Sequence, residues 1–169
     1  MKRKLPAVIV VALLVAMGVG VFLWKSSVPP EPPKDAIPHG GRLFKLYLED
    51  IPWDEARAKC ERLGGRLVIV QDQATHAFLG GLTKGKLFWI GATDEHQEGD
   101  WRWVDGSEVT FDGWHDKQPG NLGGKEHYLL IGALGKWNDV GLEGPGGARR
   151  MQGFICEWPA PEETQTKSP

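Results

Sequence analysis

The sequence predicts an α+β fold with two helices, a mainly antiparallel sheet and one long loop region. Two stretches with helical spacing lie in the first half of the domain, at residues 52–64 and 72–81. After them come only short strand-like pieces, separated by long intervals rich in turn-forming residues. The abundant glycine and tryptophan fit a loop-rich domain with an aromatic core better than a helical bundle. A loop region of about forty residues inside a compact domain is usually functional.

The first elements of the domain have clear signals. Residues 43–48 indicate a strand, and Pro52 suits the first turn of a helix. In that helix the apolar positions recur at helical spacing and should face the core, until Gly64-Gly65 ends it. These apolar positions are Trp53, Ala56, Cys60 and Leu63.

The remaining elements are shorter. Residues 67–70 indicate a strand, and Asp72 can cap a second helix that buries Phe78 and Leu79 and ends at Gly80-Gly81. Further strands are expected at residues 87–90, 101–103, 128–131 and 153–157.

The N-terminus predicts a membrane anchor. An apolar run over residues 5–24 follows Lys2-Arg3-Lys4, and about twenty helical residues span the ~30 Å of a bilayer core. The basic cluster ahead of the run favours a cytoplasmic N-terminus with the rest of the chain translocated. The alternative is a cleavable signal peptide, because Ala16 and Gly18 offer small residues for cleavage. Residues 19–24 would then form an apolar mature N-terminus, so we favour the uncleaved anchor.

The chain therefore divides into four parts. We expect an anchor or signal peptide over residues 1–25, a Pro-rich stalk over 26–41, one domain over 42–158 and a disordered tail over 159–169. This organisation predicts a single-pass membrane protein with an extracytoplasmic domain, or a secreted protein if the signal is cleaved. The net charge of −2 gives no reason to expect a nucleic-acid partner.

Two cysteines, Cys60 and Cys156, lie near opposite ends of the domain. In a translocated domain they should pair, because the compartment is oxidising. The alternatives are two buried free thiols in a reducing compartment and, less favoured, a zinc site that lacks the other ligands of a tetrad.

Several motifs in this order resemble the C-type lectin-like domain over about residues 43–158. They are the first helix and its glycine exit, Phe88-Trp-Ile-Gly91, Gln118-Pro119, Trp137-Asn-Asp139 and Gly153-Phe-Ile-Cys-Glu157. The resemblance implies that Cys60 and Cys156 form the family's outer disulfide. The family's second, loop-stapling disulfide is absent, and its positions fall on Tyr128 and Leu142.

The resemblance also implies a calcium site that ligates sugar hydroxyls. Its ligand positions fall on Gln118, Glu126, Asn138 and Asp139, and Gly120 stands where a further ligand is expected. A site with fewer carboxylates binds calcium weakly. Asn138 and Asp139 are alternatively explained as an ordinary turn.

A second calcium position of the family falls on Asp94, Glu98, Asn121 and Glu126. This set keeps three carboxylates, so we expect any calcium to bind here more readily than at the sugar-ligating set. Asp94 and Glu98 are alternatively solvated turn residues. His127 stands where many members carry an acid, which lowers the negative charge of the site.

We therefore interpret the domain as a non-catalytic module that binds a carbohydrate or glycoprotein ligand, with weak calcium dependence. Trp114 is the candidate for stacking against a sugar ring. The main alternative is a calcium-independent protein-binding domain of the same fold. An enzyme is disfavoured because no nucleophile stands beside a base. Arg149-Arg150, beyond a glycine-rich loop, offer a cationic contact for an acidic ligand, although a solvated loop is the simpler interpretation.

Overall fold

The computed structural model describes residues 30–145 and 150–160. The predicted anchor over residues 5–24 and nearly all of the predicted tail lie outside the described residues. Within the described ranges, no helix combines the length and the apolar character needed to cross a membrane.

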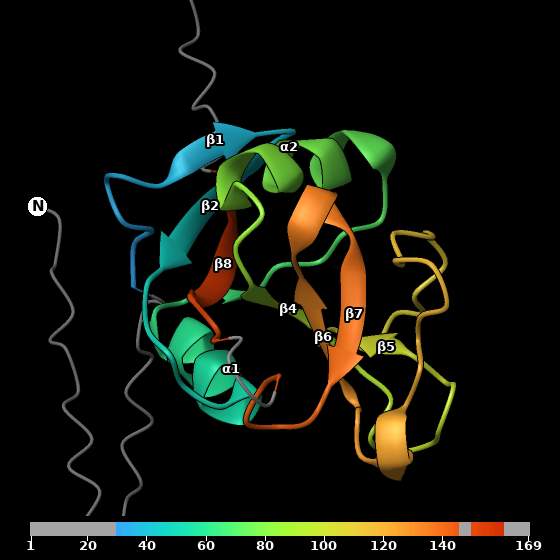
Figure 1. Cartoon of the computed structure of the whole chain (residues 1–169). Helices are drawn as coiled ribbons and strands as arrows, with labels where there is room; N and C mark the ends of the chain where they lie inside the picture. The colour runs from blue at the N-terminus through green and yellow to red at the C-terminus, as the bar shows by residue number, and fades with distance from the viewer. Residues whose placement is uncertain (1–29, 146–149, 161–169) are drawn as a thin grey trace, which may run out of the picture.

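A single mixed sheet organises the described part of the chain (Figure 1). Its strands follow the order β1-β2-β8-β4-β6-β7, while β3 pairs with β8 and β5 pairs with β4. The β4–β8 pairing is parallel and the other pairings are antiparallel, as predicted for a mainly antiparallel sheet. The strands are β1 (Ile37–His39), β2 (Arg42–Tyr47), β3 (Arg66–Leu67), β4 (Phe88–Thr93), β5 (Arg102–Trp103), β6 (Tyr128–Ile131), β7 (Trp137–Val140) and β8 (Gly153–Pro159).

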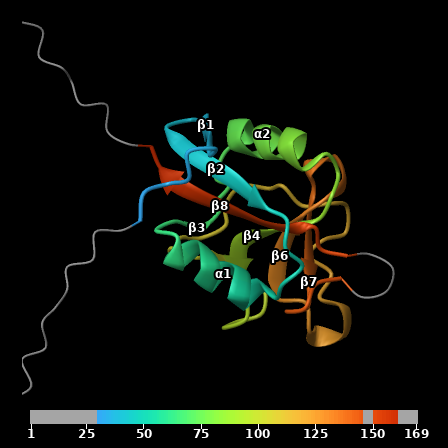
Figure 2. The ribbon, with the colours of Figure 1, turned by 90° about the vertical axis from the view of Figure 1, so that its left-hand side faces the viewer.

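Two α-helices, α1 (Trp53–Arg62) and α2 (Gln73–Thr83), lie on opposite sides of this sheet (Figure 2). Helix α1 buries Trp53, Ala56 and Cys60 in one core cluster, as its apolar stripe predicts. Helix α2 contributes Leu79 to the other cluster. The Asp72 side chain accepts a hydrogen bond from Thr75 N at 2.8 Å, which confirms the predicted cap.

The disulfide between Cys60 and Cys156 is present and joins α1 to β8. Tyr128 and Leu142, at the positions of the missing second disulfide, both pack against the core cluster that contains these cysteines. The Leu142 carbonyl also accepts a hydrogen bond from Trp53 N at 3.1 Å. Apolar packing and this hydrogen bond thus connect the region that a second bridge would staple.

Helix α2 does not end at Gly80-Gly81 as predicted but continues to Thr83. The reason is packing against the β6–β7 connection, the 3-10 turn η2 (Ala133–Gly135). A Cβ built on Gly80 would lie 3.2 Å from the Gly135 Cα. The glycine therefore permits close contact inside the helix and does not terminate it.

Two further boundaries differ from the prediction. Residues 37–39, assigned to the stalk, form β1 and pair with β2, so the sheet begins before residue 42. The strand expected at residues 67–70 is only β3, because Val68 then hydrogen bonds both to Ile155 of β8 and to Gly91 of β4.

Both ends of the described chain lie together, since Pro30 and Ala160 line one hollow. Beside them β2 pairs with β8, with Arg42 opposite Pro159 and Lys45 opposite Cys156. The buried Glu157 of β8 accepts from Arg42 at 2.6 Å and from Arg66 at 2.8 Å. These contacts hold β2 and β3 against β8 at this end of the sheet.

Candidate functional site

The long loop region connects β5 to β6 and is anchored by tryptophans. Trp101 and Trp114 pack edge to face with ring centroids 5.0 Å apart, and Trp114 lies 5.9 Å from Trp137. Trp103 contacts Trp137 at 5.7 Å. Because Trp101, Trp103 and Trp137 are buried, the aromatic cluster fixes the base of the loop region on the sheet.

This packing bears on the predicted role of Trp114. Its ring is half-buried and packs against the core, and its backbone N–H donates to Asp112 Oδ1 at 3.2 Å. Only part of the ring is therefore open to a sugar, and stacking by Trp114 stays a prediction for that exposed part.

The sheet register assembles the first acidic cluster. Thr93 of β4 pairs with Tyr128 of β6, which places Asp94 next to His127 across the ladder. The Asp94 N–H donates to the His127 carbonyl at 3.2 Å, and His127 Nδ1 lies 3.0 Å from Asp94 Oδ1. His127 Nδ1 is also 3.6 Å from Glu98 Oε2. Ligand atoms of Asp94, Glu98 and His127 all lie within 4.8 Å of one another.

Asn121 and Glu126 join this cluster in part. The Asn121 amide donates to the Glu98 carboxylate, and its Oδ1 accepts from Glu126 N at 3.1 Å. The Glu126 carboxylate accepts from Leu122 N at 2.7 Å, in the 3-10 turn η1 (Leu122–Gly124). Four predicted residues are thus brought together, and His127 is a contacting member that the sequence indicated only as a change of charge.

The sugar-ligating set has a different geometry, which centres on Asp139 of β7. Asp139 is fully buried and accepts two backbone hydrogen bonds, from Gly120 N at 3.0 Å and from Asn121 N at 2.6 Å. The Asn138 amide donates to the Asp139 carbonyl at 2.9 Å. Asp139 therefore acts as a staple that holds the loop region against β7.

Gly120 and Gln118 complete this arrangement. A Cβ built on Gly120 would lie 2.8 Å from Gln118 Oε1, so the inward turn of the Gln118 side chain depends on glycine there. Gln118 Oε1 is enclosed and has no hydrogen-bond partner among the described residues. The peptide between Gln118 and Pro119 is cis.

The two sets differ in their fit to calcium, which needs several oxygen ligands with negative charge. At the sugar-ligating set both Asp139 carboxylate oxygens already accept hydrogen bonds from backbone N–H groups. Gly120 has no side-chain oxygen to offer, so the residues present do not fit the ion. At the first cluster Asp94 and Glu98 converge with the Asn121 and Glu126 side chains close by. That donor set fits a divalent cation better, although an imidazole stands among its ligands.

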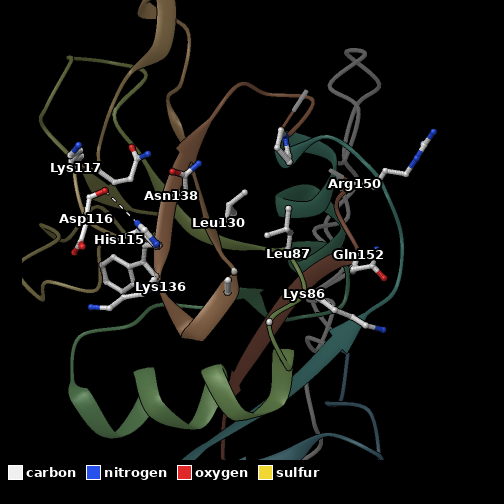
Figure 3. Close-up of a pocket in the computed structure, with 16 residues that line it drawn as sticks. Lys86, Leu87, His115, Asp116, Lys117, Leu130, Lys136, Asn138, Arg150 and Gln152 are labelled. Atoms are coloured by element: carbon white, nitrogen blue, oxygen red, sulfur yellow. Dashed lines mark hydrogen bonds between the residues drawn. The ribbon is translucent and has the colours of Figure 1, made fainter. Parts of the chain in front are cut away.

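Gln118 and Asn138 also line a cavity of about 790 Å³. Leu87 and Leu130 lie between two groups of polar side chains (Figure 3). One group comes from the loop region, residues 115–117, and the other comprises Lys86, Arg150 and Gln152.

Burial shifts the pKa of Glu157 and of His76, which both lie outside the cavity. It raises the pKa of Glu157, and Arg42 and Arg66 oppose that shift. It also lowers the pKa of His76, which packs against Phe111 and Trp137 under the loop region. Both groups support the scaffold that holds the site.

The sequence is similar to known proteins. Residues 49–157 match the Lectin C-type domain. Hepatic lectin of Gallus gallus is 38% identical over 102 residues, which cover 59% of this chain and 49% of that protein. The galactose-specific lectin nattectin of Thalassophryne nattereri is 30% identical over 134 residues, covering 76% of this chain and 84% of nattectin.

A solved structure shares the fold. The carbohydrate-recognition domain of the mouse scavenger receptor C-type lectin aligns with a TM-score of 0.70 and 26% identity, over 78% of this chain and all of that domain. The chain spans about half the length of the chicken hepatic lectin that it matches.

Proposed function

Because the chain belongs to the C-type lectin family, we propose that it binds carbohydrate through the cavity beside Gln118 and Asn138 and performs no catalysis. The observation that carries this proposal is the cavity itself. Its volume of about 790 Å³ falls in the range of small-ligand sites, about 300–1,000 Å³. Gln118 and Asn138 line its edge. Gln118 Oε1 is enclosed, so Gln118 can offer only its amide N–H groups to sugar hydroxyls, whereas the Asn138 carboxamide can donate and accept.

Relatives support a sugar ligand. Nattectin is named as galactose-specific and hepatic lectin as a lectin. We do not assign a particular neutral sugar, because Gly120 removes a ligand position that discriminates between sugars in the family.

Calcium, in this proposal, strengthens the loop region and does not ligate the sugar. When bound, the ion supplies a positive centre that holds Asp94, Glu98, Asn121 and Glu126 together. These residues contact one another in and beside the loop region, while Asp139 holds that region against β7 through backbone hydrogen bonds. Sugar binding should therefore persist in a chelator, at reduced affinity.

A glycan array with and without chelator tests the binding activity. We expect bound glycans in both conditions, and Gln118→Ala and Asn138→Ala should each weaken binding several-fold. The control is Gln73→Ala, an exposed residue at the start of α2. Absence of any bound glycan, with the fold intact by circular dichroism, would contradict the proposal.

The calcium contribution is measured by thermal melting. At a calcium concentration ten times its Kd, binding to the folded state alone adds about 1.4 kcal/mol. Glu126→Gln should abolish the rise in Tm and Asn138→Ala should retain it. If the unmodified chain shows no rise in millimolar calcium, the metal hypothesis is wrong.

The second candidate is calcium-independent binding of a protein partner. It is favoured by one observation: both Asp139 carboxylate oxygens accept hydrogen bonds from backbone N–H groups of the loop region. Glycan-independent capture of a purified protein, unaffected by Gln118→Ala, would distinguish it from sugar binding.

We also propose that the domain is displayed outside the cytoplasmic membrane by the apolar segment at residues 5–24. The Cys60–Cys156 disulfide supports an oxidising compartment. N-terminal sequencing of the mature protein checks this proposal: a new N-terminus near Gly18, in a soluble fraction, would show cleavage and secretion instead.

A further inference from the structure

We infer that the ligand of this cavity is an anionic saccharide, one that carries a carboxylate or a sulfate group. This inference rests on the proposed function and adds the chemical class of the sugar. Its basis is the charge around the cavity, in a chain whose net charge is −2.

Four cations line the cavity: Lys86, Lys117, Lys136 and Arg150. Asp116 is the single carboxylate among its described lining residues. Cations thus outnumber acids here, although acids outnumber cations in the chain as a whole. This local excess of positive charge favours a ligand with a negatively charged group in the cavity.

The lysines are available to a ligand. Among the described residues, Lys86, Lys117 and Lys136 form no ion pair, and all three are exposed. In the described part of the chain, Arg150 pairs only with Asp50, at 3.9 Å, and both of these side chains are well exposed. Such exposed pairs contribute little energy, so Arg150 can exchange Asp50 for a ligand at small cost.

These cations come from four separate segments. Lys86 precedes β4, Lys117 lies in the loop region, Lys136 precedes β7 and Arg150 precedes β8. The fold therefore gathers charges that have no common sequence motif. Lys117 also has a left-handed backbone, with φ 65°, a conformation that costs a non-glycine residue energy and is often retained at binding sites.

The floor of the cavity explains why a saccharide is favoured over a free inorganic anion. Leu87, Leu130 and Ala133 give it apolar surface that suits the C–H face of a sugar ring. The Gln118 amide N–H groups and the Asn138 carboxamide can bind hydroxyls, and the exposed cations of the lining can bind an acidic substituent. A ligand with all three features makes full use of the lining.

Four soluble probes test the inference with the purified full-length chain. Lactose, sialyllactose and sulfated lactose share one neutral core, so their comparison isolates the carboxylate and the sulfate. Polyphosphate provides negative charge without a sugar. Affinities are measured by calorimetry in chelator, at low and at high salt.

We expect sialyllactose or sulfated lactose to bind at least about tenfold tighter than lactose, with the preference lost in high salt. Lys117→Gln and Lys136→Gln should each weaken binding of the acidic sugar about fivefold, the effect of one solvent-exposed charge pair, and so reduce the ratio of acidic-sugar affinity to lactose affinity. Lys34→Gln is the matched control, because Lys34 is also exposed and does not line the cavity.

Two results would overturn the inference while leaving the proposed function intact. The first is equal, salt-insensitive affinity for lactose and its acidic derivatives. The second is a glycan array on which only neutral sugars bind. If polyphosphate binds as tightly as the acidic sugars and competes with them, the cavity is a general anion site and the saccharide assignment is wrong. If neither neutral nor acidic glycans bind, the proposed function fails as well.

Discussion

Asp139→Asn should destabilise the domain by releasing the loop region from β7. The carboxylate is fully buried and accepts from Gly120 N and Asn121 N. Asparagine has nearly the same shape but keeps only one acceptor oxygen, and its NH₂ group would face the other N–H. One hydrogen bond to a charged group is lost, about 1.5–3 kcal/mol, and a buried donor is left unsatisfied.

We therefore expect the free energy of unfolding to fall by about 2–4 kcal/mol. Urea denaturation followed by tryptophan fluorescence measures this change, since Trp114 and Trp137 lie at the base of the loop region. Hydrogen exchange should also accelerate at the amides of Gly120 and Asn121 more than at the strand amides of β2. Opening of the loop alone would give this local pattern.

Asp116→Asn is the control, because its carboxylate is exposed and makes no hydrogen bond among the described residues. Asp116→Asn should change the free energy of unfolding by no more than about 0.5 kcal/mol. If Asp139→Asn is equally silent and exchange at Gly120 and Asn121 is unchanged, Asp139 does not hold the loop region.

Three other perturbations test the scaffold. Because burial lowers the pKa of His76, the unfolded chain takes up this proton near pH 6.5, at a higher pH than the folded chain does. Stability should therefore fall as the pH drops from about 7 to 5, by up to ~1.4 kcal/mol per unit, and His76→Leu should flatten this dependence in urea titrations. Arg42→Met should lower the free energy of unfolding by about 3 kcal/mol in chemical denaturation, because the buried Glu157 keeps fewer partners. Adding Glu157→Gln should recover part of that loss. If the effects of the two substitutions on stability simply add, the ion pair contributes little. Replacing Cys60 and Cys156 together by serine should cost up to about 4.7 kcal/mol, because the bridge closes a loop with a sequence separation of 96; an unchanged Tm would show that the bridge constrains little.

Elements with a strong periodic or capping signal were predicted well from the sequence. The apolar stripe of α1, the Asp72 cap of α2 and strand β6 are where the sequence places them. Strand β7 was missed because Trp-Asn-Asp carries two polar residues that indicate a turn; pairing with β6 overrides that local preference. Strand β1 was missed for a similar reason, since Pro38 argues against a strand but is tolerated at a sheet edge.

The candidate site was predictable only where the family motif marks it. The motif indicates Asp94 and Glu98, but contact between His127 and Asp94 depends on the β4–β6 register, which brings together residues 33 positions apart. The hydrogen bonds from Gly120 N and Asn121 N to the Asp139 carboxylate likewise depend on backbone geometry, and no sequence motif indicates them. The four cations of the cavity come from separate segments and share no sequence motif. Of these four, the sequence indicated only Arg150 as a contact for an acidic ligand.

The closeness of residues 30 and 160 determines how the domain would respond to mechanical force. Tension applied at these two ends would first peel β1 from β2 and would then open the β2–β8 ladder one residue pair at a time, beginning at Arg42 and Pro159. Peeling of β8 would stop at Cys156, where the disulfide passes the load to Cys60 in α1. The 95 residues between the two cysteines include the whole cavity lining and the whole loop region, and they would bear none of the tension. A pull through the ends of the chain would therefore leave the ligand-binding face unloaded.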